Sequence, residues 1–86
     1  MTYVLFRHRK LSDFYCAVPQ GMDVPAFVQD EQWERSGETR PDEPRPLGFD
    51  DQTARYSVEL QGFYTFREVS FVERQLQAQR SGNKPI

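Results

Sequence analysis

The side chains best suited to chemistry in this chain are its single cysteine and its single histidine, Cys16 and His8. Cys16 could act as a nucleophile with His8 as its general base, because an imidazole titrates near neutral pH. No catalytic motif accompanies the pair, and a lone cysteine usually packs as a small hydrophobe. We therefore assign no catalytic residue and expect a protein that is not an enzyme. A Cys16/His8 enzyme is the least favoured alternative.

The densest basic run spans residues 7–10, RHRK, and could lie beside aromatic residues of a sheet. Exposed aromatic side chains next to basic groups can stack the bases of single-stranded nucleic acid. A nucleic-acid-associated module is thus the first alternative function, although the formal net charge of −2 argues against it. We do not expect a nucleic-acid partner. The candidate basic patch comprises Arg7, Arg9, Lys10 and Arg67.

No metal site and no cofactor are predicted. One histidine and one cysteine cannot complete a closed zinc site. The neighbouring carboxylates Asp50 and Asp51 lack the spacing of a calcium loop, and an aspartate at a helix start already has a structural role. The five glycines are dispersed, so no phosphate-binding loop is present.

Length and composition bound the class of protein. Eighty-six residues form one domain, which we place at residues 1–80, with a flexible tail at 81–86. A single cysteine excludes an intrachain disulfide, and small secreted domains normally depend on disulfides. The apolar run at the N-terminus is too short for a signal segment or a membrane span. We therefore expect a cytoplasmic protein without a membrane partner.

Alternating and β-forming residues predict strands at 2–8, 14–18 and 63–69, the first two joined as an antiparallel hairpin. Cys16 would then share a face with the apolar residues at 14 and 18. The segment 22–34 is ambiguous, although Pro25 suits the first turn of a short helix.

A helix is predicted at residues 51–61. Asp50 or Asp51 can cap its start, and Gly62 stands where a left-handed residue ends a helix. The alternation of Tyr56, Val58 and Leu60 favours a strand instead. We prefer the helix because acidic start and glycine stop enclose a span of helical length.

Residues 36–46 contain three prolines and no aliphatic or aromatic side chain, which predicts an exposed loop. Residues 71–80 have good helix propensity and predict a C-terminal helical segment. The fold class is therefore α+β: a small antiparallel sheet of three to four strands, with the 51–61 helix on one face.

Apolar residues occur on both faces of the predicted strands, and one helix cannot cover two faces. An uncovered apolar face marks a partner surface. We therefore expect a small binding protein that self-associates, as a homodimer, through an aromatic sheet face or edge. Its partner could also be another protein. The candidate interaction residues are Tyr3, Leu5, Tyr64 and Phe66.

Five short pieces of the sequence together resemble a family of short uncharacterised proteobacterial proteins, a domain of unknown function. They are FYCAVPQG at 14–21, the proline at 25, Trp-Glu at 33–34, LGFD at 47–50 and QGFYTF at 61–66. These pieces indicate turns and strands and contain no catalytic signature, and they fall between residues 1 and 70. The resemblance implies a compact cytoplasmic bacterial α+β protein and supplies no substrate or catalytic residue.

Overall fold

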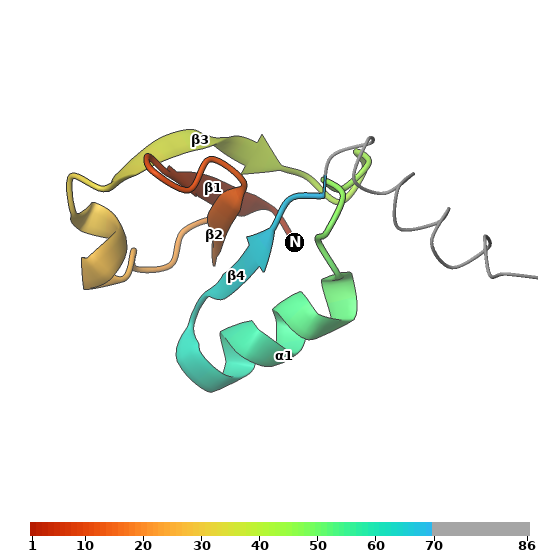
Figure 1. The fold of residues 1–86 in the computed structure, drawn as a ribbon. Coiled ribbons are helices and arrows are strands. Elements are labelled where there is room, and N and C mark those ends of the chain that lie inside the picture. The colour runs from red at the N-terminus through yellow and green to blue at the C-terminus, as the bar shows by residue number, and fades with distance from the viewer. Residues whose placement is uncertain (70–86) are drawn as a thin grey trace, which may run out of the picture.

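A computed structural model describes residues 1–69 of the chain (Figure 1). Its elements are β1 (Tyr3–His8), β2 (Phe14–Pro19), the 3-10 helix η1 (Ala26–Gln29), β3 (Trp33–Thr39), α1 (Asp51–Gln61) and β4 (Tyr64–Arg67). The predicted helical segment 71–80, the tail 81–86 and the end of the predicted domain lie outside the described residues.

The four strands form one sheet in the order β3-β1-β2-β4, and every neighbouring pair is antiparallel. The predicted α+β class is therefore confirmed. The predicted hairpin is confirmed as well, since β1 pairs with β2 and places Val4 opposite Val18. The two central strands of the sheet are thus the first two in the chain.

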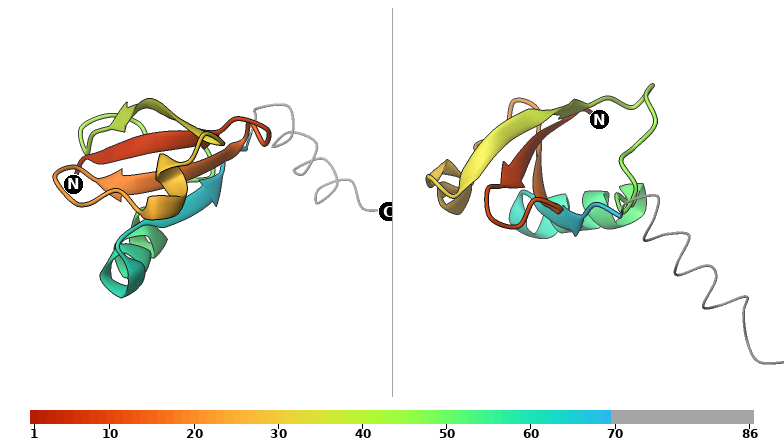
Figure 2. Two further views of the ribbon diagram at one scale, coloured as in Figure 1. Left: turned by 90° about the vertical axis from the view of Figure 1, so that its left-hand side faces the viewer. Right: turned by 45° about the horizontal axis from the view of Figure 1, so that its top comes forward.

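Each face of the sheet is covered by a crossover connection. The chain passes from β2 to β3 across β1, and this connection brings η1 onto one face. It then passes from β3 at one edge to β4 at the other, and this second connection brings α1 onto the opposite face (Figure 2). A helical element therefore packs on each face, and η1 covers its face only in part, because several apolar side chains there stay half-buried or exposed.

The α1 face carries the larger core. Its buried members are Tyr3, Leu5, Tyr15, Ala17, Ala54, Tyr64 and Phe66, with Phe49 and Val58 packed against them. On α1, Ala54 and Val58 recur at i and i+4, whereas Tyr56 and Leu60 are exposed. Gly62 adopts a left-handed φ of 88° and donates its backbone N–H to the Val58 carbonyl. The helical interpretation of 51–61 is confirmed.

The η1 face carries a smaller core. Cys16, Val18 and Val28 are almost fully buried there. Half-buried apolar residues pack around them: Phe6, Val24, Trp33 and Phe63. Cys16 and Val18 share this face, as predicted.

The prediction of an exposed loop at 36–46 is wrong for residues 36–39. Residues 36–39 belong to β3, which pairs with β1 through a register shift between Leu5 and Phe6. Thr39 is buried, and only 15% of the Arg45 side chain is exposed. An edge strand needs hydrogen bonds to one neighbour only, so it can form without the apolar residues on which the prediction relied.

Candidate interaction surface

Aromatic side chains form a continuous stripe on the η1 face. The stripe consists of five residues from different parts of the chain: His8, Phe14, Phe27, Trp33 and Phe63. The Trp33 ring centroid lies 5.0 Å from His8, 5.4 Å from Phe14 and 5.8 Å from Phe27. Phe27 lies 5.0 Å from Phe63. Four of these rings are half-buried, and Phe27 is 43% exposed, so the stripe both covers the small core and faces solvent.

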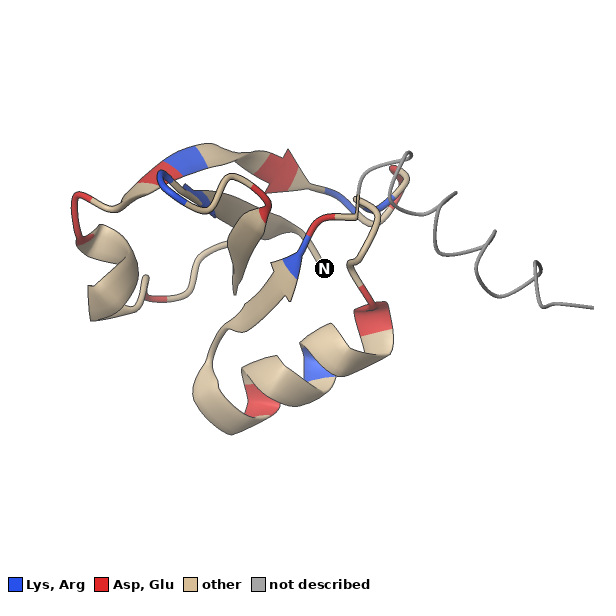
Figure 3. Cartoon of the chain, viewed as in Figure 1, with Lys and Arg blue, Asp and Glu red and all other residues tan. Residues whose placement is uncertain are grey.

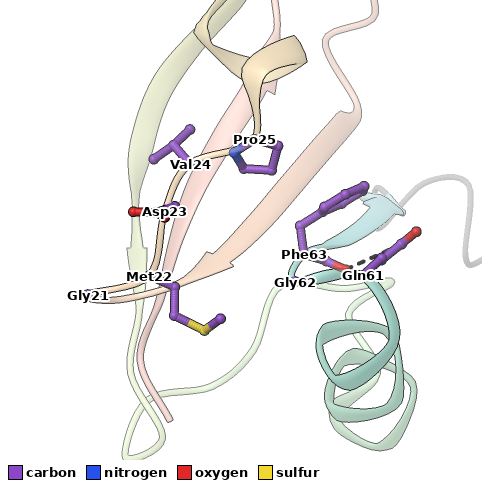
Figure 4. A pocket seen from close by; sticks show the side chains of 8 residues that line it. All are labelled: Gly21, Met22, Asp23, Val24, Pro25, Gln61, Gly62 and Phe63. Atoms are coloured by element: carbon purple, nitrogen blue, oxygen red, sulfur yellow. Dashed lines mark hydrogen bonds between the residues drawn. The ribbon is translucent and has the colours of Figure 1, made fainter.

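A groove of about 490 Å³ adjoins the stripe. It lies between residues 21–25, which follow β2, and residues 61–63, which join α1 to β4. Figure 4 shows Met22 and Phe63 projecting from these two segments, which are distant in the sequence. Phe63 belongs to both stripe and groove, and Met22 is 49% exposed. Together they extend the apolar surface.

Local backbone geometry explains how the groove forms. Gly62 ends α1 in a left-handed conformation, so the chain turns and Phe63 reaches the η1 face instead of continuing the helix. The Ser57 hydroxyl and the Gln61 side-chain amide both donate to the Phe63 carbonyl, at 2.7 and 3.4 Å. These bonds fix one wall of the groove against the end of α1.

The chain segment that supplies most of the stripe and of the groove is acidic in sequence. Residues 11–34 supply four of the apolar side chains, at 14, 22, 27 and 33, and contain five carboxylates but no lysine or arginine. Figure 3 shows acidic positions on both connections that flank η1. Basic residues are concentrated instead at 7–10, at the end of the hairpin. Asp13 and Glu34 pair with arginines, whereas the other three carboxylates have no ion pair within residues 1–69.

The structure divides the predicted basic patch. Arg7 and Arg9 lie 3.0 and 3.7 Å from the Glu34 carboxylate, and the hydrogen bond from Arg7 lowers the pKa of that carboxyl. Arg67 pairs with Asp13. Arg67 alternates with the buried residues of β4, which places it on the face opposite Arg7. Lys10 is exposed at the hairpin turn. Most of this charge is already compensated by carboxylates.

The four predicted interaction residues lie in the core beneath α1. Tyr3, Leu5, Tyr64 and Phe66 are 1%, 8%, 7% and 6% exposed. The expectation that they face a partner is wrong for this fold, because α1 covers the face that they share. Exposed apolar groups lie instead at Met22 and Phe27 on the other side of the sheet, and at Tyr56 and Leu60 on the outer side of α1. The sequence contains a sign of the surface at Met22 and Phe27, because these large apolar residues lie among glycine, proline and aspartate residues that form turns.

Cys16 and His8 do not form a catalytic pair. Cys16 is fully buried, and burial raises the pKa of its thiol to about 12. It stands opposite Phe6 in the sheet rather than opposite His8. The Nδ1 atom of His8 accepts hydrogen bonds from the backbone N–H groups of Lys10 and Leu11, at 3.2 and 3.1 Å, and so holds the hairpin turn. A nucleophilic cysteine must be reachable and readily ionised, and Cys16 is neither.

Within residues 1–69, no group of three or more His, Cys, Asp or Glu side chains could hold a metal ion. The aspartates at the start of α1 have protein partners: Asp50 accepts a hydrogen bond from Thr53, and Asp51 pairs with Arg45. In the same part of the chain, no helix has the length and apolar character needed to cross a membrane.

Comparisons of the chain with family models, with curated proteins and with solved structures find no match. The resemblance to a bacterial family therefore stays a prediction. The function has to be inferred from the surface itself.

Proposed function

We propose that this chain is a small binding protein rather than an enzyme, and that it pairs with a second copy of itself through the aromatic stripe and the groove. The observation that carries the proposal is the five-ring stripe, which continues into the groove at Phe63 and remains partly exposed. Exposed contiguous apolar surface is typical of interaction sites, and aromatic side chains dominate their energetics.

The course of the stripe supports a second copy as the partner. One end lies at the hairpin, where Leu11 is 56% exposed and lines a small hollow with Phe14 and with the ion-paired side chains of Asp13 and Arg67. The other end lies at the groove beside Met22. Two copies related by a twofold axis, with their stripes antiparallel, would seat the hairpin end of each on the groove of the other.

Charge supports the same pairing. The hairpin end brings the exposed Lys10, whereas residues 21–31, which form one wall of the groove and η1, contain three carboxylates and no lysine or arginine. Complementary charge favours association and fixes its orientation. It also disfavours a nucleic-acid partner, since the phosphate backbone would meet the acidic residues around the stripe. A cytoplasmic location fits the buried free thiol of Cys16, which needs no oxidising compartment.

Sedimentation velocity over a range of low to high micromolar concentrations tests the pairing. We expect the chain to shift from monomer to dimer, and the dimer to weaken as salt rises. Phe27→Ser and Met22→Ser should each raise the dissociation constant by roughly tenfold or more, as interface aromatic and apolar anchors do. Lys10→Glu should weaken the dimer as well.

Matched controls lie on the α1 face. Tyr56 and Leu60 are 65% and 69% exposed there, so Tyr56→Ser and Leu60→Ser remove comparable apolar surface and should leave the dimer unchanged. Arg40→Glu provides the control for the charge change. A monomer mass at high micromolar concentration would refute the proposal. A mass that grows beyond the dimer would refute the twofold arrangement.

A further inference from the structure

A second cavity, of about 360 Å³, lies on the α1 side of the molecule. It is bounded by the start of β1, the loop at 41–45 and the first turn of α1. Its lining is polar and includes two cations and two carboxylates: Arg45, Arg55, Glu43 and Asp51. Cavities that bind small molecules begin at about 300 Å³ and place a few polar groups around the ligand.

Tyr3 lines this cavity, and its hydroxyl is the side-chain polar atom that it can present there. Tyr3 is 1% exposed, and its hydroxyl has no hydrogen-bond partner among residues 1–69. Within the same residues, every side-chain nitrogen or oxygen that is sealed from solvent has a partner, so this hydroxyl is not sealed. Burial raises the pKa of Tyr3, and the charges of Arg45, Asp51 and Arg55 act on it too. An almost buried hydroxyl therefore stands among these charged groups without a bond to any of them.

Some charged side chains of the lining have an ion-pair partner and others do not. The Arg45 guanidinium pairs with Asp51 and donates to backbone carbonyls, so these two charges compensate each other. Within the described residues, Arg55 and Glu43 have no ion pair. Among residues 1–69, the cavity thus presents one cation and one carboxylate without an ion pair, and one hydroxyl without a hydrogen bond.

We propose that this cavity binds a small zwitterion of the α-amino-acid class, with the ligand carboxylate on Arg55 and the Tyr3 hydroxyl and the ligand ammonium on Glu43. Arginine and a hydroxyl donor together bind carboxylate oxygens well. The four charged side chains of the lining balance, so a ligand that carries both signs adds no net charge to them. A simple anion would instead pair with Arg55 but leave Glu43 without a group of opposite charge.

Amide chemical shifts of the full chain, recorded while glycine is added at millimolar concentrations, test the proposal. We expect saturable shifts of residues around the cavity, smaller shifts with acetate, and none with inorganic phosphate. Tyr3→Phe keeps the ring and removes only the hydroxyl. It should weaken glycine binding by about threefold to tenfold, the effect of one hydrogen bond. Tyr56 is an exposed tyrosine of α1 outside the cavity, so Tyr56→Phe should leave glycine binding unchanged.

Two further variants separate the roles of the open charges. Arg55→Gln should weaken both glycine and acetate, whereas Glu43→Gln should weaken glycine alone. Both Arg55 and Glu43 are exposed, so neither substitution should disturb packing, and thermal unfolding would verify that each variant keeps the fold. Absence of saturable shifts with glycine overturns the proposal. Equal binding of glycine by the wild-type chain and Tyr3→Phe overturns it also.

Discussion

The guanidinium carbon of Arg45 lies 5.5 Å from the centroid of the Tyr3 ring. It lies 5.1 Å from the Phe49 ring as well, within the range of a cation–π contact. The same side chain donates to the carbonyls of Thr39 and Met1, each at 3.3 Å, and pairs with Asp51 at 2.9 Å. One cation therefore joins the first strand, the end of β3 and the start of α1.

Replacing this cation should destabilise the fold. Arg45→Met leaves the two carbonyls and Asp51 without their donor, so we expect the free energy of unfolding to fall by about 2–3 kcal/mol. Arg45→Lys should also be destabilising, because an ammonium cannot reproduce the planar donor geometry. Urea denaturation measures both. Arg40→Met removes an exposed arginine and should change stability little; an equal loss in the two variants would contradict this role of Arg45.

A comparison of two glycines should separate backbone strain from steric conflict. Both Gly21 and Gly48 have left-handed φ, at 89° and 99°. A Cβ on Gly48 would lie 2.1 Å from the backbone oxygen of Arg67, whereas a Cβ on Gly21 would meet nothing within 4 Å. Gly21→Ala should cost about 1–2 kcal/mol, the penalty of the left-handed conformation alone. Gly48→Ala should cost clearly more, because β4 must shift. Equal midpoints in urea would refute this difference.

Cys16 should react with thiol reagents only when the fold opens. Its burial disfavours the thiolate, so labelling of the native chain should be slow and should accelerate in step with unfolding by urea. The raised pKa also has a consequence for stability. The thiol stabilises the fold below its ordinary value of 9.0, and this contribution is lost as pH rises toward about 12. Cys16→Ala should remove that alkaline loss; rapid labelling of the folded chain would contradict the prediction.

Acid should weaken the fold through three carboxylates. Hydrogen bonds from Arg67, Arg7 and Thr53 respectively lower the pKa values of Asp13, Glu34 and Asp50. Their stabilising contribution is present above the ordinary values of 3.8 and 4.5 and is lost as pH falls through the lower folded values.

Thermal midpoints recorded from neutral to acidic pH measure this loss. Asp13→Asn should flatten the acidic limb, and Asp42→Asn, at an exposed loop position, should leave it unchanged. The same slope in Asp13→Asn and in the wild-type chain would contradict the assignment.

The predicted helix shows what local sequence can determine. It begins after Asp50, which is in extended backbone, and ends at Gly62, which is left-handed; the Asp50 carboxylate accepts the Thr53 hydroxyl and makes no cap hydrogen bond to the backbone. The competing strand pattern failed because Tyr56 and Leu60 point to solvent while Ala54 packs on the sheet. The residues that bound this segment therefore distinguished correctly between a helical and a strand pattern.

The missed strand and the misplaced surface show what local sequence could not determine. β3 contains no aliphatic residue, and it forms because β1 offers it a full row of backbone partners. The candidate surface was assigned to Tyr3 and Phe66 because their faces could not be distinguished before α1 and η1 were placed. Likewise, no local pattern brings Arg45 onto the Tyr3 ring. These features depend on contacts between segments distant in the chain.

The strand order has a consequence for how the chain folds as it is made. The central hairpin and β3 are complete once residue 39 has been synthesised, but α1 and β4 follow later. Until they dock, Tyr3, Leu5 and Tyr15 lack the elements that bury them in the finished fold. Pairing β4 with β2 also closes the longest loop in the sheet, which makes it the slowest contact to form. A nascent chain would therefore display its larger core as an aromatic surface, open to chaperones and to misassembly, until β4 arrives.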